Sequence, residues 1–121
     1  VNTFYRRRTL KMIPTRIELK KQSRTLALSY ADGDYALSFE LLRVLSPSAE
    51  VRGHGKPILQ HSKKSVQLVG IEQAGNYALK LSFDDGHDSG LYTWDYLRKL
   101  ALEQTSLWQD YLDQLSDAGL S

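Results

Sequence analysis

The fold is decided by residues 17–30, IELKKQSRTLALSY, which contain two short segments of alternating apolar and polar residues. The apolar members are Ile17 and Leu19, then Leu26, Leu28 and Tyr30. A period of two is typical of strands with one buried face. The polar connector between the segments is short, so we expect the two strands to be antiparallel neighbours.

Downstream of these strands the pattern predicts a turn, a third strand and a short helix. Residues 31–34, ADGD, have the composition of a turn, and a third strand is expected from Tyr35. Residues 39–45, FELLRVL, cluster their apolar residues as a helical turn does. Ser46-Pro47 then marks a boundary, because Pro47 suits the first position of a new turn that Ser46 could cap. Residues 51–57 contain two glycines and a proline and predict an irregular loop.

The second half of the chain predicts two more strands and a helical end. Residues 65–83 read as two strands joined by a turn at Ala74-Gly75-Asn76. The expected faces are Val66, Leu68 and Gly70 in the first strand, and Tyr77, Leu79 and Leu81 in the second. A helix is expected to open at Thr93, and apolar residues continue at helical spacing until Gly119. The predicted class is therefore α+β, a small and mainly antiparallel sheet with C-terminal helices packed on it.

Length and composition are those of a globular domain. The chain has 121 residues, of which 41% are hydrophobic and 25% charged, which is enough for one core. We interpret residues 1–13 as a flexible basic extension and residues 14–121 as a single domain with a C-terminal helical extension. No apolar run approaches the roughly 20 residues of a membrane span, and the first residues do not resemble a secretory signal. A cytoplasmic location without membrane contact is expected.

Charge and cysteine content limit the function classes. There is no cysteine, which excludes disulfides, thiolate metal sites and cysteine nucleophiles. Residues 1–24 carry eight lysines and arginines against one acid. The first four of these cations are Arg6, Arg7, Arg8 and Lys11. Such an arm could meet nucleic acid through phosphate contacts, but no aromatic platform or nucleic-acid motif follows it, and we expect a solvated tail.

Three histidines, His54, His61 and His87, could ligate a metal together with carboxylates. None of them stands at metal-ligand spacing. The metal-site hypothesis is centred on His87 with Asp84, Asp85 and Asp88, and with His54 as a further ligand. The alternative interpretation is a histidine that hydrogen bonds its neighbours and fixes a turn.

The sequence evidence for a catalytic site is weaker than that for a metal site. A Ser-His-Asp set could be drawn from Ser46 or Ser48, His54 or His87 and an aspartate, but the sequence contains no nucleophile-elbow motif. Residues 53–56, GHGK, do not complete a phosphate-binding loop. No catalytic residue is therefore predicted.

Two stretches resemble a known family. They are residues 42–55, LRVLSPSAEVRGHG, and residues 85–97, DGHDSGLYTWDYL, preceded by GNYAL at residues 75–79. Over residues 14–100 the chain resembles the gamma-butyrobetaine hydroxylase-like N-terminal domain, and in particular its stand-alone bacterial members of unknown function. The resemblance implies kinship and names no activity.

The resemblance also implies a lost metal site. In the eukaryotic hydroxylases this domain precedes a catalytic domain that uses iron and 2-oxoglutarate, and it holds a structural zinc through three cysteines and a histidine. His87 matches that histidine, whereas Ser46, Ser48 and Val51 stand where the cysteines are expected. One ligand of four is retained, so the zinc site is expected to be absent.

We therefore predict a non-catalytic accessory or protein-interaction domain with no cofactor and an unidentified protein partner. The predicted binding loop comprises Ser46, Ser48, Glu50, Arg52, His54, Lys56 and Trp94, with exposed aromatics near Trp94 and Trp108. The alternative function is metal binding, of iron or zinc, by His87 and the nearby aspartates, with a link to iron or iron–sulfur metabolism. The two loops, residues 46–55 and 84–90, are expected to lie near one another.

Overall fold

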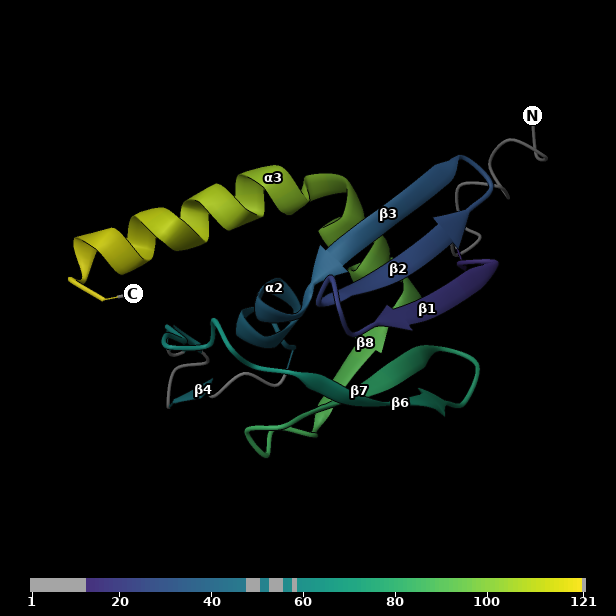
Figure 1. Cartoon of the computed structure of the whole chain (residues 1–121), viewed down its shortest axis with the longest axis horizontal. Helices are drawn as coiled ribbons and strands as arrows, with labels where there is room; N and C mark the ends of the chain where they lie inside the picture. Colours follow the sequence, from purple (N-terminus) through teal and green to yellow (C-terminus); the bar gives the residue numbers. More distant parts are fainter. Residues whose placement is uncertain (1–12, 48–50, 53–55, 58, 121) are drawn as a thin grey trace.

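The computed structural model describes residues 13–47, 51–52, 56–57 and 59–120. The predicted N-terminal extension lies outside these residues, except for Ile13. The described elements form two three-stranded antiparallel sheets, a two-stranded ladder and two helices (Figure 1). The α+β class predicted from the sequence is confirmed.

The first sheet has the order β1-β2-β3. Its strands are β1 (Arg16–Lys20), β2 (Thr25–Tyr30) and β3 (Gly33–Ser38). Both pairs are antiparallel, as expected, with Ile17 opposite Leu28 and Leu26 opposite Leu37. The third strand begins two residues earlier than predicted, because the turn uses only residues 31 and 32. Gly33 makes this tight turn possible with a φ of 147°, which other residues rarely adopt.

The segment after β3 forms the short helix α2 (Phe39–Val44). The Ser38 hydroxyl accepts a hydrogen bond from the Leu41 N–H at 3.0 Å and so caps the helix. The predicted irregular loop is partly wrong, because β4 (Val51–Arg52) and β5 (Lys56–Pro57) pair as a short antiparallel ladder. A ladder of two residues is too short to leave an alternation in the sequence. The turn that Ser46 was expected to cap falls on residues 48–50, outside the described residues.

The second sheet has the order β6-β7-β8. It contains β6 (Leu68–Ala74), β7 (Ala78–Phe83) and β8 (Gly90–Thr93). A bulge between Leu68 and Gly70 interrupts the alternation expected in the first strand. Tyr77 lies in the turn and is 50% exposed, so it does not share the buried face of Leu79. The strand β8 was not predicted, because four residues that begin with glycine carry almost no periodic signal.

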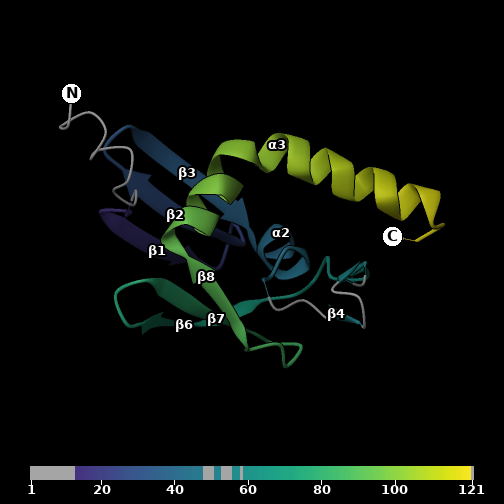
Figure 2. The same ribbon diagram turned by 180° about the vertical axis from the view of Figure 1, so that it is seen from behind.

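A single long helix, α3 (Trp94–Asp117), ends the described chain, where several helices were expected. The Thr93 hydroxyl caps it by accepting the Tyr96 N–H at 3.1 Å, as predicted. Gly119, with a φ of 70°, lies just past its end. The C-terminal half of α3 projects away from the sheets (Figures 1 and 2). No helix among the described residues is long and apolar enough to cross a membrane.

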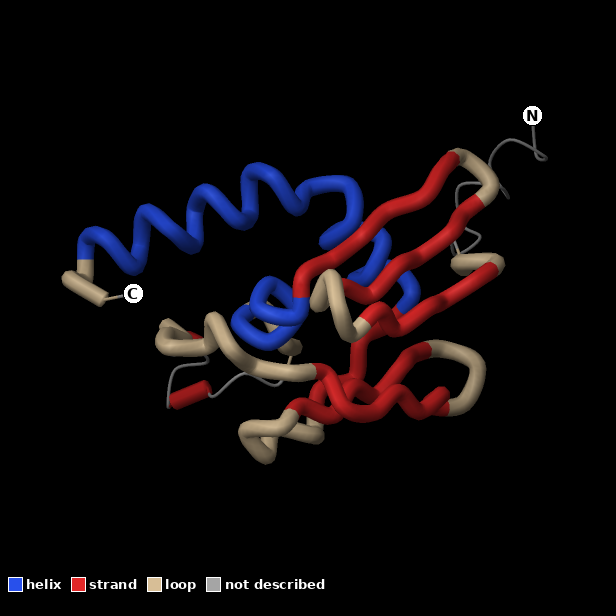
Figure 3. Tube along the Cα trace, in the orientation of Figure 1, coloured by secondary structure: helices blue, strands red, loops and turns tan. Residues whose placement is uncertain are grey.

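One main core joins both sheets and the helices. Figure 3 shows how these helices and strands are arranged. Leucines and aromatics from β2, β3, α2, β6, β7, β8 and α3 share it. Its largest fully buried side chains include Tyr92, Phe39, Leu26, Leu81 and Leu97. A smaller cluster of Val44, Tyr111 and Leu115 ties the outer half of α3 to α2. Because α2 contributes residues to both clusters, its position determines the direction in which α3 projects from the sheets.

Two tyrosines hold the C-terminal end of α2. The last carbonyl groups of a helix have no partner within the helix. The Tyr92 hydroxyl donates to the Leu42 carbonyl at 2.5 Å, and the Tyr96 hydroxyl donates to the Leu45 carbonyl. Burial raises the pKa of both tyrosines above the ordinary value, so both hydroxyls keep the protons that they donate. The helix end is thereby attached to β8 and α3.

We expect Tyr92→Phe to lower the free energy of unfolding by about 1–3 kcal/mol, because it leaves the Leu42 carbonyl buried without this donor. Urea denaturation followed by circular dichroism measures the effect. The matched control is Tyr77→Phe, which removes the same atom from an exposed ring and should change stability by less than about 0.5 kcal/mol. Equal effects of the two substitutions would contradict the assigned role of Tyr92.

Candidate functional site

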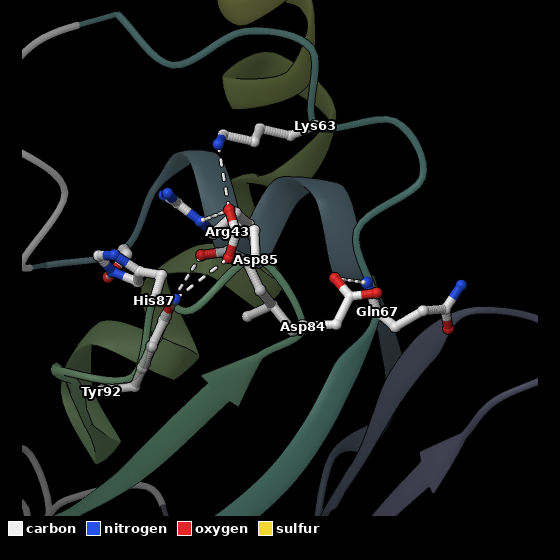
Figure 4. A network of polar contacts seen from close by, with 9 residues as sticks. Arg43, Lys63, Gln67, Asp84, Asp85, His87 and Tyr92 are labelled. Carbon is white, nitrogen blue, oxygen red and sulfur yellow. Dashed lines mark hydrogen bonds and ion pairs between the residues drawn. The ribbon is translucent and has the colours of Figure 1, made fainter.

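The first candidate site is the polar network around the β7–β8 loop, residues 84–89 (Figure 4). At its centre is Arg43 of α2, whose side chain is only 4% exposed. Its Nε donates to Oδ2 of Asp85 at 2.8 Å. A buried guanidinium requires a nearby negative charge. The β7–β8 loop is therefore fixed to α2 by charge pairing as well as by packing.

Asp85 accepts hydrogen bonds from three groups. Besides Arg43, the ammonium group of Lys63 donates to Oδ2 at 3.0 Å, and the backbone N–H of His87 donates to Oδ1 at 3.2 Å. Partial burial acts to raise the pKa of Asp85, but these donors outweigh it and hold the pKa at about 2. The carboxylate stays ionised throughout the physiological range.

Asp84 has a different structural contact. Its Oδ1 accepts the backbone N–H of Gln67 at 3.0 Å, and its own N–H donates to the Gln67 carbonyl at 2.9 Å. Figure 4 shows this contact on the opposite side of the loop from His87. Asp84 thus connects the end of β7 to the segment that leads into β6.

His87 contacts Ser46, with 2.9 Å between the His87 Nε2 atom and the Ser46 hydroxyl. Ser46 also hydrogen bonds the Tyr92 hydroxyl and thereby lowers the pKa of Tyr92, an effect smaller than the rise caused by burial. The Tyr92 hydroxyl donates its proton to the Leu42 carbonyl. The Ser46 hydroxyl thus lies between the His87 ring and the Tyr92 hydroxyl.

The surroundings of Ser46 argue against a serine nucleophile. In a catalytic triad a carboxylate hydrogen bonds and orients the imidazole ring of the base. Asp85 bonds the His87 backbone N–H, and its carboxylate is already paired with two cations. Ser46 is also only 6% exposed. The relay from His87 through Ser46 and Tyr92 to Leu42 is therefore suited to joining α2 to the loop.

The predicted metal ligands are only partly brought together. Asp84 and Asp85 make the structural contacts above, Asp88 is exposed, and His54 lies outside the described residues. In the described part of the chain, no three histidines, aspartates or glutamates are grouped so that they could hold a metal ion. The metal site on His87 stays a prediction.

The donor atoms present do not suit the zinc site that the family resemblance implies. Ser46 brings a hydroxyl to His87, and hydroxyls are poor zinc ligands. Val51 carries no donor atom, and Ser48 lies outside the described residues. The proximity of Ser46 and His87 nevertheless confirms that the two predicted loops meet there.

Two residues of the predicted binding loop are buried. Trp94 was expected to be exposed, and this expectation is wrong: it is 5% exposed, and its indole N–H donates to the Asn76 carbonyl at 2.7 Å. Ser46 is buried as well. Ser48, Glu50 and His54 lie outside the described residues, and the backbones of Arg52 and Lys56 pair in the β4–β5 ladder. A binding role for this loop stays a prediction.

The second candidate site is a groove of about 490 Å³ between α3 and the β2–β3–α2 unit. We call it the α3 groove. Its lining residues are Thr25, Ala36, Ser38, Glu40, Leu41, Gln104, Thr105, Trp108 and Gln109. The volume lies within the range of natural ligand pockets. The half-buried Trp108 supplies an aromatic surface among amides and hydroxyls.

Sequence reasoning missed several of these residues. Arg43 gave one signal, because it is a charged residue within the apolar helical turn 39–45. Glu40 and Gln104 gave none, since the groove forms only where segments far apart in the chain meet. Trp108 was named only as an aromatic near a binding surface formed by the loops at residues 52–56 and 84–90, whereas the structure places it in the α3 groove.

Comparisons with known proteins agree with this fold. The model of the family described as gamma-butyrobetaine hydroxylase-like, N-terminal, matches residues 17–98. One NMR solution structure is 60% identical to this chain, has a TM-score of 0.84, and covers 93% of this chain and 90% of its own. A second NMR solution structure is 51% identical, has a TM-score of 0.78, and covers 91% of this chain and 84% of its own. A crystal structure from Acidithiobacillus ferrooxidans, of a protein of unknown function in the DUF971 family, is 38% identical, has a TM-score of 0.62, and covers 73% of this chain and 91% of its own. No curated protein matches the chain.

We expect Asp85→Asn to lower the free energy of unfolding at pH 7 by about 1–3 kcal/mol, because Arg43 loses its counter-charge. The folded-state pKa is about 2, below the ordinary value of 3.8. The stabilisation is therefore present above the unfolded-state pKa and is lost as the pH falls toward 2. Denaturant titrations from pH 7 to pH 2 should show the difference between the two proteins shrinking toward zero. Asp88→Asn, in the same loop but exposed, is the control, and a difference independent of pH would refute this assignment.

We expect Ser46→Ala and His87→Ala each to cost about 1 kcal/mol or more of stability, since each interrupts the buried relay. The double variant should cost less than the sum of the two, because both substitutions break the same hydrogen bond. Thermal and urea denaturation of the four proteins complete the cycle. Strict additivity, or an unchanged melting temperature in His87→Ala, would show that the contact contributes nothing.

Proposed function

Because the chain belongs to the gamma-butyrobetaine hydroxylase-like N-terminal domain family, we propose that it is a non-catalytic accessory domain that binds a partner protein through the α3 groove. The family comparison supplies the fold and names no specific role. The observation that carries the proposal is the groove itself, an open, aromatic-containing surface at the junction of α3, α2 and β3.

The composition of the α3 groove supports protein binding. Interfaces are enriched in aromatic residues, and their surroundings carry hydrogen-bonding groups that stay accessible to water. Trp108 offers such an aromatic surface, while Thr105 and Gln109 are exposed beside it. Leu112 continues the same helix and is also partly exposed. A peptide segment could bury apolar surface here and still satisfy its backbone groups.

The polar residues around His87 support a role without catalysis. The His87 ring, the Ser46 hydroxyl and the Asp85 carboxylate are engaged in contacts between α2 and the β7–β8 loop. Catalysis needs a group that reaches the reacting atoms in a site open to substrate. These contacts instead serve the stability of the domain, which is what a binding scaffold requires.

Metal binding is the alternative function, and one observation favours it. His87 and Ser46, two positions that match zinc ligands of the family, lie in contact at 2.9 Å. Near-stoichiometric zinc or iron in protein purified without a tag or chelator, lost in His87→Ala, would support this alternative. Such a metal would also have to raise the melting temperature, since a metal that binds only the folded protein stabilises it.

A pair of neighbouring substitutions on α3 tests the proposed function. Thr105→Tyr places a bulky ring in the groove, whereas Ser106→Tyr places the same ring on an exposed position that does not line it. Both proteins should melt within a few degrees of the wild type. In quantitative affinity capture from cells that produce the protein, a protein bound by the wild type and by Ser106→Tyr should be lost with Thr105→Tyr.

The comparison between the two variants decides the outcome. A partner retained equally by both would show that binding occurs elsewhere on the domain. Loss of the partner with both would indicate a general effect on α3. Only selective loss with Thr105→Tyr supports the α3 groove as the docking site.

A further inference from the structure

The α3 groove contains one carboxylate, that of Glu40. Glu40 stands in the first turn of α2 and is half-buried at the wall of the groove. Within 4.0 Å it forms no ion pair with any residue that the structure describes. Lys64 and Arg24 act on it only at longer range and do not offset its burial, so its pKa is raised. A cation placed in the groove would supply a closer counter-charge.

A buried phenol, that of Tyr111, lies within electrostatic range of Glu40. Its hydroxyl is buried and has no hydrogen-bond partner among the residues that the structure describes. Burial, with a further contribution from the negative charge of Glu40, raises the pKa of Tyr111 to about 12. The phenol therefore stays neutral, and the charge of Glu40 remains available to a ligand.

The aromatic residue in the groove also suits a cation. Trp108 lines the groove together with Glu40 and packs against Tyr111 with 5.3 Å between ring centroids. Indole rings attract guanidinium and ammonium groups and pack against the aliphatic part of their side chains. The amide oxygens of Gln104 and Gln109 provide neutral acceptors at the same surface.

The outer half of α3 adds a wider negative field. From residue 102 to the C-terminus the chain has four acids and no lysine or arginine. The acids are Glu103, Asp110, Asp113 and Asp117, and all four are exposed. Such a field favours the approach of positively charged partners.

We infer that the α3 groove binds an arginine or lysine side chain from a basic segment of the partner protein. Glu40 pairs with the cation, and Trp108 packs against its aliphatic stem. This inference rests on the proposed function and adds the chemistry of the partner. Local charge complementarity is its basis. The groove contains a carboxylate that has no ion pair among the described residues, and the charged residues of the adjoining helix half are all acidic.

The test uses the ¹⁵N-labelled protein and three capped peptides in NMR titrations. The peptides are Gly-Leu-Arg-Arg-Leu-Gly, Gly-Leu-Gln-Gln-Leu-Gly and Gly-Leu-Glu-Glu-Leu-Gly. The arginine peptide should shift the amide signals of Gln104 and Thr105 and the indole signal of Trp108. Its affinity should exceed that of the glutamine peptide about tenfold or more, as expected for a partly desolvated ion pair, and should fall with added salt.

Two variants distinguish the contribution of the groove carboxylate to peptide binding from that of the exposed acids on α3. Glu40→Gln should bring the affinity for the arginine peptide down to that for the glutamine peptide, which itself should not change. Glu103→Gln removes an exposed acid outside the groove and should have an effect of less than about twofold. Unchanged melting temperatures of both variants confirm that the fold is intact.

Three other outcomes of the peptide titrations would contradict the inference. If the glutamine or glutamate peptide shifts the groove signals as strongly as the arginine peptide, the groove binds peptides and the basic preference is wrong. If the arginine peptide binds equally well to Glu40→Gln, the assigned role of Glu40 is wrong. If no peptide shifts these signals, both the inference and the α3 groove as docking site are wrong.

Discussion

The described structure depends on how the buried charge of Arg43 is compensated. A guanidinium on a six-residue helix cannot remain buried without a counter-charge, and Asp85 supplies it from a loop 42 residues away. The same loop places His87 beside Ser46, and the strand that follows it brings Tyr92 to the Leu42 carbonyl. These contacts fix α2 against the second sheet. Since Leu41 of α2 lines the α3 groove, the buried ion pair also determines the shape of the candidate binding surface.

The Ser46–His87 contact suggests how the domain keeps its loop arrangement without thiolate ligands. In relatives with cysteines, a zinc ion is expected to join the two loops, at an affinity that itself contributes to folding. Here a relay of hydrogen bonds connects them, aided by the charged pair of Arg43 and Asp85. Each hydrogen bond contributes far less than a metal ion. The relay is sufficient because the main core already brings the two sheets and α2 together.

The elements that the sequence predicted are those with a periodic pattern. The alternation of Ile17, Leu28 and their neighbours marks β1 and β2, because one face of β2 is buried and the matching face of β1 is partly buried. Thr93 marks the start of α3 through its capping hydroxyl. By contrast, β4, β5 and β8 have two to four residues each and leave no period to detect. Burial of Trp94 was also missed, since its hydrogen bond to Asn76 depends on the β6–β7 turn reaching the start of α3.

The sequence predicted the polar site around His87 but not the α3 groove. Around His87, a motif concentrates polar residues within a few positions, and this drew attention to a region whose polar groups hold the fold together. The α3 groove has no such motif, because its wall is assembled from β2, β3, α2 and α3. Polar groups that already have partners within a fold gain little from a ligand. A half-buried carboxylate such as Glu40, which has no ion pair with the residues that the structure describes, is stabilised by a cationic ligand. In this domain the candidate ligand surface is therefore identified by a half-buried charge that lacks a close counter-charge. Such a charge can be recognised only in the folded chain, because its burial depends on segments far apart in the sequence.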